Sequence, residues 1–354
     1  MKQFVLAILL LVTVSACSSD GEVETSGNTS ETTQQLGTTV GQDQSAETTT
    51  SESSDSTVEG VEETNINSPA DTTSATTSAT TAGQSVFSPS GNPTEGIDQV
   101  SELSSGYRFT EGPAWVEDLG AWLFTDIPNS RVVQVTPSGQ ESTFSSRIGN
   151  GVIVDSRGNI VLAGNAGRDL VSFDSAGNET TIADAFQGTR FNSPNDLVEL
   201  PGVGYFITDP IFGSAAADLC RGVYLVTYSG DVTQTLCNSG NPNGIVLSPD
   251  LQTVYIALSS NGQVLQASVD PTTGEVGSTQ AFAQTSGIPD GMVVDGAGNV
   301  YVTANAGVEV YGSNGAQLGV ISVPQKPSNV ALGGPNGNTL LITAVTSVYT
   351  VDIS

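Results

Sequence analysis

The chain of 354 residues contains no histidine, and this absence removes two familiar kinds of active site. A Ser-His-Asp triad and a Cys-His pair both need a side chain that is missing here. Basic residues are also scarce, with 9 Lys and Arg against 37 Asp and Glu and a formal net charge of −28. Nucleic acid is therefore not an expected partner, because phosphate binding requires clustered Lys and Arg. An anionic membrane surface would repel so acidic a chain as well.

The first segment, MKQFVLAILLLVTVSAC, places one lysine before an apolar run of about a dozen residues. The run is too short for a spanning helix and predicts a secretory signal peptide over residues 1–16. The tetrad Val14-Ser15-Ala16-Cys17 resembles a bacterial lipobox, which implies cleavage before Cys17 and lipidation of its thiol. An ordinary signal peptide that contains a cysteine is the alternative. The lipobox predicts an exported protein of the bacterial cell envelope, anchored to the membrane only through Cys17 and facing the periplasm or the cell surface.

Residues 17–93 are expected to form a disordered tether. From residue 18 onward this stretch has no Lys or Arg, carries 12 acids and repeats Ser and Thr in segments such as SATTSATTAG. It cannot bury enough apolar surface to offset the entropy of ordering it. Residues 94–354 suffice for one large all-β domain, and we expect that domain to be a monomer.

Only three cysteines are present, and Cys17 belongs to the signal. Cys220 and Cys237 flank the segment RGVYLVTYSGDVTQTL, which reads as two strands joined by a turn at Ser229-Gly230. The two cysteines would then lie nearly opposite each other on neighbouring strands. In an exported protein a disulfide is the expected pairing, with two buried thiols as the alternative.

Six apolar, strand-like segments recur through residues 94–354 at intervals of 39 to 49 residues. They are AWLFTD, NIVLAGN, GYFITD, TVYIAL, NVYVTA and TLLITA, ending at Asp126, Asn165, Asp209, Leu258, Ala304 and Ala344. Each follows a turn-rich connection and a shorter apolar strand, and further strands follow it. Four strands per repeat and six repeats predict a six-bladed β-propeller, with a pair of sandwiches as the alternative. The sixth repeat is one strand short, and residues 101–109 are expected to supply that outer strand and close the ring.

A second pattern lies fourteen or fifteen residues before the end of each repeated segment. The residues there are Glu111, Asn150, Asn195, Asn243, Asp290 and Asn329. Each opens the first strand of its repeat, and in a propeller that strand is innermost, so the six side chains should meet around the axis at one end. All six carry a side-chain oxygen, the ligand that Ca²⁺ and other hard cations prefer. The alternative is that they are ordinary turn residues at strand entrances.

The motifs EGPAW, RFNSPNDLV, FITDPIFG, NPNGIVLSPD and PDGMVVDGAGNVYVT together resemble the gluconolactonase and regucalcin (senescence marker protein) family. The resemblance covers about residues 105 to 352 and implies a six-bladed propeller with one catalytic divalent cation on its axis. That cation is usually Ca²⁺, with Zn²⁺, Mg²⁺ or Mn²⁺ as alternatives. By position, Glu111, Asn243 and Asp290 look like the core ligands. Asn195 looks like a further ligand or a substrate-orienting amide.

The resemblance also implies that Asp290 acts as general base or nucleophile. Asn150 and Asn329 are inferred from their phase alone and are expected to line the channel. Arg190, in GTRFNSPND, is a candidate for binding a hydroxyl or carboxylate of the substrate, with a surface ion pair as the alternative.

The predicted activity is cation-dependent hydrolysis of a small-molecule lactone or ester. A bound cation would polarise the carbonyl and activate water, and a neighbouring carboxylate would take the proton of that water. Two alternatives stay open. One is a non-catalytic extracellular binding propeller with a structural cation, and the other is phosphotriester hydrolysis at the same site.

Overall fold

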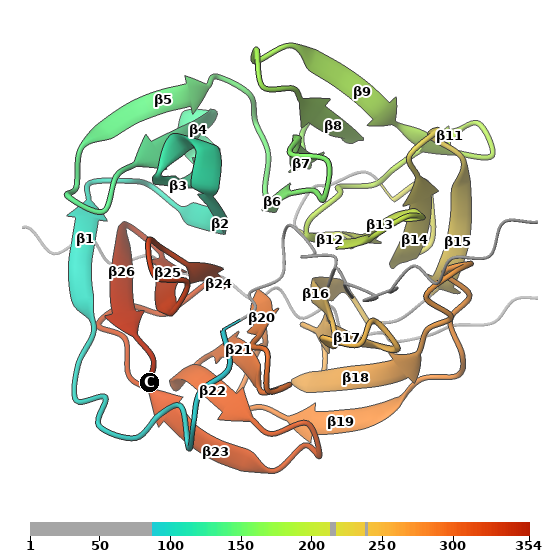
Figure 1. The fold of residues 1–354 in the computed structure, drawn as a ribbon. Coiled ribbons are helices and arrows are strands. Elements are labelled where there is room, and N and C mark those ends of the chain that lie inside the picture. Colours follow the sequence, from blue (N-terminus) through green and yellow to red (C-terminus); the bar gives the residue numbers. More distant parts are fainter. Residues whose placement is uncertain (1–86, 213–216, 238–239) are drawn as a thin grey trace, which may run out of the picture. The chain divides into compact units, whose positions relative to one another are not determined.

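Six four-stranded antiparallel sheets surround one axis in the computed structural model (Figure 1). The structure describes residues 87–212, 217–237 and 240–354, which all belong to the compact unit Ser74–Ser354. The sequence prediction of an all-β, six-bladed propeller with four-stranded blades is confirmed. The signal peptide, Cys17 and the expected tether up to residue 86 lie outside the described residues.

The strands of each blade follow one another outward from the axis, and the blades are numbered in chain order by their innermost strand. The innermost strands are β2 (Thr110–Val116), β6 (Val152–Val154), β12 (Leu197–Leu200), β16 (Pro242–Leu247), β20 (Met292–Val294) and β24 (Asn329–Gly333). The second strands are β3 (Ala121–Asp126), β7 (Ile160–Gly164), β13 (Gly204–Asp209), β17 (Thr253–Leu258), β21 (Val300–Ala304) and β25 (Thr339–Ala344).

The third strands are β4 (Arg131–Val135), β8 (Asp169–Phe173), β14 (Gly222–Thr227), β18 (Gln263–Ser268), β22 (Gly307–Tyr311) and β26 (Ser347–Asp352). The outermost strands are β5 (Glu141–Ser145), β9 (Glu179–Ala183), β15 (Val232–Cys237), β19 (Gln280–Gln284), β23 (Gln317–Ile321) and β1 (Ser101–Ser105). A short hairpin of β10 (Ala185–Phe186) and β11 (Thr189–Arg190) precedes blade three, and two 3₁₀ turns, η1 (Glu117–Leu119) and η2 (Ile127–Asn129), belong to blade one.

Blade six is completed by a strand from the other end of the domain. Its sheet has the order β1-β26-β25-β24, and Ser101 pairs with Thr350 while Ser105 pairs with Ser347. This pairing confirms the prediction that residues 101–109 supply the missing outer strand. It also satisfies the backbone of β26, which would otherwise present an open sheet edge.

Turn chemistry explains why the repeats are so regular. Asp155 Oδ1 accepts hydrogen bonds from the backbone N–H groups of Arg157 and Asn159, at 3.0 and 2.7 Å. Asp295 does the same in blade five, with Ala297 and Asn299 as donors, both at 2.9 Å. Such side-chain-to-backbone bonds replace the missing ladder bonds of a tight turn. These acids are therefore turn formers.

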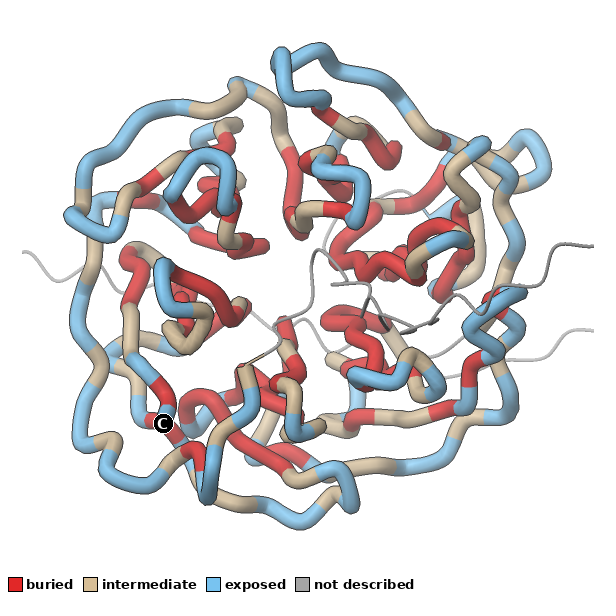
Figure 2. The backbone as a smooth tube through the Cα atoms, viewed as in Figure 1, coloured by how far each residue is buried: buried red, intermediate tan, exposed pale blue. Residues whose placement is uncertain are grey.

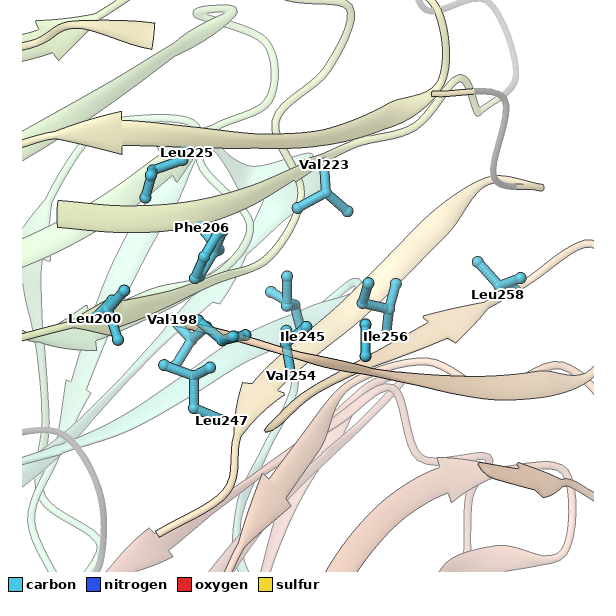
Figure 3. Packing of buried hydrophobic residues seen from close by; sticks show 12 residues of the cluster. Val198, Leu200, Phe206, Val223, Leu225, Ile245, Leu247, Val254, Ile256 and Leu258 are labelled. Carbon is cyan, nitrogen blue, oxygen red and sulfur yellow. The ribbon is translucent and has the colours of Figure 1, made fainter. Parts of the chain in front are cut away.

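Burial decreases with distance from the axis. Figure 2 shows buried residues gathered on the inner strands and exposed residues on the outermost ones. Neighbouring blades pack face to face, and Figure 3 shows Val198 and Phe206 of blade three beside Ile245 and Val254 of blade four. Both faces of the inner strands are covered in this way, so their sequences read as nearly continuous apolar runs.

Two further features hold the domain together. The predicted disulfide between Cys220 and Cys237 is present, with the Cα atoms 5.7 Å apart, and it closes the third and fourth strands of blade three. Residues 87–93, inside the stretch expected to be a tether, contact blade five, where Phe87 O accepts the N–H of Gly296 at 2.6 Å. Asn92 Nδ2 donates to Leu318 O at 3.1 Å.

Within the described ranges, no helix has the length and apolar character needed to cross a membrane.

A candidate metal and catalytic site

The six oxygen-bearing residues predicted from the repeats lie at or just before the innermost strands, at one end of the axis. We call this end the entry face, and the opposite end, where each innermost strand turns into the second strand, the turn face. Five of the six residues are buried, with 4 to 7% of each exposed, and Asp290 is partly exposed. The five buried residues are Glu111, Asn150, Asn195, Asn243 and Asn329.

Close backbone approach brings these strands together. A Cβ atom added to Gly112 would lie 2.1 Å from Asn150 O, and one added to Gly244 would lie 2.3 Å from Asp290 O. The Gly244 N–H in turn donates to Asp290 O at 3.1 Å. Glycine is therefore required after these ring residues because any side chain would push apart two neighbouring blades. We call the six positions the axial ring.

Two aspartates hold the loops that lead into the ring. Asp126 Oδ1 accepts the N–H groups of Arg108 and Phe109, at 3.0 and 3.4 Å, just ahead of Glu111. Asp209 accepts the N–H groups of Asn192 and Ser193, at 2.8 and 2.6 Å, just ahead of Asn195. Each aspartate ends the second strand of its own blade. The aspartates that end AWLFTD and GYFITD thus fix the loops that lead to Glu111 and Asn195.

Buried threonines at the next-to-last position of three second strands form hydrogen bonds to the backbone of the axial ring and its neighbours. Thr125 Oγ1 donates to Asn150 O at 3.0 Å, across a blade boundary. Thr303 Oγ1 donates to both Gly291 O and Ser328 O at 2.9 Å. In blade six Thr343 Oγ1 accepts the Asn329 N–H at 3.0 Å. The ring backbone is therefore fixed by side chains of the second strands as well as by the sheets.

Three carboxyl groups meet at the ring, and burial raises the pKa of each. Desolvation raises the pKa of Asp290 to about 7, although the charge of Lys326 opposes this rise. Desolvation, reinforced by the charge of Asp290, raises the pKa of Asp196 to about 7. The pKa of Glu111 is raised well above its usual range by desolvation and by the charges of Asp290 and Asp196. Like charges held close in a dry site are unfavourable, so this arrangement favours a compensating cation.

Amide side chains hold these carboxylates by hydrogen bonds. Asn329 donates hydrogen bonds to the carboxylates of both Glu111 and Asp196, and Asn243 donates to Asp290. Asn243 Nδ2 also bonds to Ser259 Oγ at 3.2 Å. The structure therefore brings together four of the six predicted ring residues, and it places Asn329 in contact with the acids as well as at the channel.

Asp196 was not predicted as a site residue. The position after each ring residue is glycine in four blades, at Gly112, Gly151, Gly244 and Gly291. In blade three that position holds Asp196, whose Oδ1 would lie 2.7 Å from a Cβ atom added to Gly151. A charged residue in place of this glycine is the signal in the sequence that could have identified it.

The basic residues Arg190 and Lys326 occupy different places. Arg190 lies on β11, where its guanidinium donates to Gly167 O at 2.6 Å and lies 4.0 Å from Asp184. These contacts belong to the hairpin ahead of blade three and match the surface ion pair that was the alternative for Arg190. Lys326 lies three residues before Asn329, in the loop that enters blade six, and its charge acts on Asp290. Gln325 fixes this loop by accepting the Thr346 N–H at 3.0 Å.

The ring fits a hard divalent cation. Asn150 Oδ1 is buried and has no hydrogen-bond partner among the described residues, so an oxygen ligand is free. In the same part of the chain no group of three His, Cys, Asp or Glu side chains forms a metal cluster by itself. A cation here would need amide oxygens in addition to carboxylates, and mixed oxygen ligands suit Ca²⁺ better than Zn²⁺.

Gly244→Ala tests the close approach at the ring. The added methyl group meets the Asp290 backbone, so we expect a loss of about 1 to 3 kcal/mol in the free energy of unfolding and weaker Ca²⁺ binding. Gly91→Ala is the matched control, because nothing lies within 4 Å of its Cβ position. Urea unfolding and calcium titration calorimetry measure both quantities. Equal behaviour of the two variants would contradict the role given to Gly244.

In the absence of divalent cations, the free energy of unfolding should fall as the pH rises from about 4 to about 7. Asp196 and Asp290 have folded-state pKa values of about 7, above the ordinary value of 3.8. Between these values the folded state binds more protons than the unfolded state, so the stability present at low pH is lost through this window. The opposite contribution of Asp126 and Asp155, whose pKa is lowered, acts below about 4.

Urea unfolding in EDTA between pH 4.5 and 8 measures this effect, and Ca²⁺ should restore stability most at pH 8. A profile that is flat or rising in EDTA would show that the three carboxyl groups do not repel one another as described.

Comparison with known proteins agrees with this architecture. The SMP-30/gluconolactonase/LRE-like region matches residues 109–346. The gluconolactonase of Zymomonas mobilis is 28% identical over 286 residues, covering 71% of this chain and 80% of that protein. The pentonolactonase of Haloferax volcanii is 28% identical over 251 residues, covering 68% and 83%.

Among solved structures, a calcium-binding regucalcin from Agrobacterium tumefaciens superimposes with a TM-score of 0.64 at 21% identity. That match covers 73% of this chain and 95% of the other, and it supports the fold. The family match covers blades one to five, the two inner strands of blade six and every residue of the axial ring, and the chain therefore belongs to the SMP-30/gluconolactonase/LRE-like family.

Proposed function

We propose that this protein is a divalent-cation-dependent hydrolase of lactones. The observation that carries the proposal is the meeting of Glu111, Asn243 and Asp290 at one end of the axis, with raised pKa values for both carboxyl groups. The lactonases among its relatives support the reaction class. Export and a lipid anchor on Cys17 are part of the same proposal.

Glu111, Asn243 and Asp290 would hold the cation, with Asn195 as a further ligand or as an amide that orients the substrate. Ca²⁺ is the cation we propose. When bound, it would supply Lewis-acid polarisation of the lactone carbonyl and lower the pKa of a bound water. Asn329 holds the Glu111 carboxylate and Asn243 holds that of Asp290, so the acids keep one orientation.

Asp290 is suited to act as the general base. It is the partly exposed member of the axial ring, and a bound cation would lower its cation-free pKa of about 7, so its carboxylate would be ionised and able to accept a proton at neutral pH. Asp290 takes one proton from water as the water oxygen bonds to the carbonyl carbon. The bond from that carbon to the ring oxygen then breaks, and the proton passes from Asp290 to the leaving alkoxide. The product is a hydroxy acid.

We propose that Lys326, rather than Arg190, binds the carboxylate of that product. Prolines at 324 and 327 flank it, and the hydrogen bonds of Gln325 hold its loop at the entry face. Its charge also lowers the pKa of Asp290, so it favours the ionised base.

The first test uses purified protein stripped of metal with EDTA. Hydrolysis of a lactone panel, an aryl ester and an organophosphate triester is followed before and after adding Ca²⁺, Mg²⁺, Mn²⁺ or Zn²⁺. We expect cation-dependent lactone turnover and a loss of at least about 100-fold in kcat for Asp290→Asn, the usual size of a general-base effect.

Asp250→Asn, in a turn at the opposite face, is the matched control and should keep full activity. Cation binding without turnover would support the binding propeller instead, and turnover of the triester alone would support a phosphotriester hydrolase. A protein that binds no cation would contradict the site itself.

Lys326→Gln should raise the inhibition constant of the hydroxy-acid product about 1.4- to fivefold, because an exposed cation contributes roughly 0.2 to 1 kcal/mol. It should also shift the acid limb of the rate–pH profile upward, since the pKa of Asp290 loses the lowering effect of this charge. Lys326→Arg should restore both values, and Arg190→Gln should change neither. Product inhibition and pH–rate measurements check this, and an Arg190 effect larger than the Lys326 effect would reverse the assignment.

A further inference from the structure

A cavity of about 390 Å³ follows the axis beneath the axial ring. Its inner end is formed by Asp196 and Asn329, at the level of the ring. Its other end lies between residues of the turn face, among them Glu117, Pro335 and Gly337. The cavity therefore occupies the part of the axis that the proposed catalytic site does not use. Its volume lies within the range of small-molecule pockets, about 300 to 1,000 Å³.

The wall of the cavity is almost entirely apolar. Alternate residues of a strand point to the same side, and near the middle of each innermost strand one such residue lines the axis. These lining residues are Trp115, Ile153, Val198, Val246, Val293 and Ala331. Four of them, from blades one, two, five and six, are only partly buried although they lie inside the ring of blades. Asp196, Asn329 and Glu117 are the polar side chains of the wall.

Larger side chains could fill this space, yet small residues keep it open. Blade six contributes Ala331, Gly333 and Gly334, all of which line the cavity. Gly333 is fixed by packing, because a Cβ atom there would lie 2.4 Å from Trp115 Cβ. The volume and the apolar lining of this cavity suit a small apolar ligand.

We propose that the axial cavity is a binding site for an uncharged aliphatic molecule, such as a medium-chain alcohol, which enters from the turn face. The apolar wall would contact the chain, and the hydroxyl would bond to Asp196 or Asn329 at the inner end. A carboxylate head group would meet Glu117 at the opening and Asp196 at the inner end, and the chain as a whole is strongly acidic. Fatty acids are therefore disfavoured although their chains would fit.

This site adjoins the proposed lactone site and shares Asp196 and Asn329 with it, but it extends toward the turn face and contains neither Glu111 nor Asp290. The two can therefore be tested independently. Binding to the cavity should not require a divalent cation, whereas turnover at the ring should.

Intrinsic fluorescence provides a direct measurement, because the only two tryptophans of the chain are Trp115, in the cavity wall, and Trp122, whose ring centre lies 5.2 Å away. The purified full chain in EDTA is titrated with 1-octanol and, separately, with octanoate. We expect a saturable change with octanol and at least about tenfold weaker binding of octanoate, which equals 1.4 kcal/mol. Titration calorimetry gives the same constants without relying on tryptophan.

Ala331→Phe fills the cavity and should abolish octanol binding. Val320→Phe is the matched control, since Val320 lies exposed on β23, outside the cavity, and should leave binding unchanged. Circular dichroism and the melting temperature establish that both variants fold, and Val293→Phe replaces Ala331→Phe if the latter does not. The proposal is overturned if octanol gives no saturable signal, if the filled variant binds as well as the control, or if octanoate binds as tightly as octanol.

Discussion

The pairing of β1 with β26 is the constraint on which the rest of the molecule depends. It joins residues 101–105 to the last strand of the domain and turns six consecutive sheets into a closed ring. Only a closed ring has an axis that six strand entrances can share. The site therefore depends on backbone hydrogen bonds formed far from it, at the outer edge of blade six. A local defect in this closure would displace axial residues that do not contact β1 or β26, because neighbouring blades pack face to face.

Once the circle of blades is closed, the chemistry of the axial ring follows from the close approach of neighbouring innermost strands. Glycines after the ring residues allow neighbouring blades to approach until a side-chain carbon would no longer fit. The same approach removes water from three carboxyl groups and raises their pKa values. The fold is thus stabilised by backbone packing at a place where its side chains repel one another. A cation that binds there would remove this repulsion and link stability to function.

The axis has two chemically different halves. At the entry face it presents carboxylates, amides and Lys326, and toward the turn face it presents valine, isoleucine, alanine and tryptophan side chains. Asp196 and Asn329 stand at the boundary and belong to both. This division arises from the innermost strands themselves, whose first residues are polar and whose middle residues are apolar. The axis therefore carries a polar ring at one end and an apolar cavity at the other, with Asp196 and Asn329 common to both.

The sequence by itself determined the number of blades, the closing strand, the disulfide and the six positions of the axial ring. This was possible because apolar strand segments and turn-forming residues such as Asp155 and Asp295 recur along the chain, the segments at intervals of 39 to 49 residues. Only the tertiary structure showed that Asp196 joins the acids, that the charge of Lys326 acts on Asp290, and that the axis stays open below the axial ring. Repeat spacing fixes where a strand begins, but it does not fix which way the next side chain points or which loop lies over the axis. Those outcomes depend on contacts between blades far apart in the chain, and such contacts leave no periodic signal in the sequence.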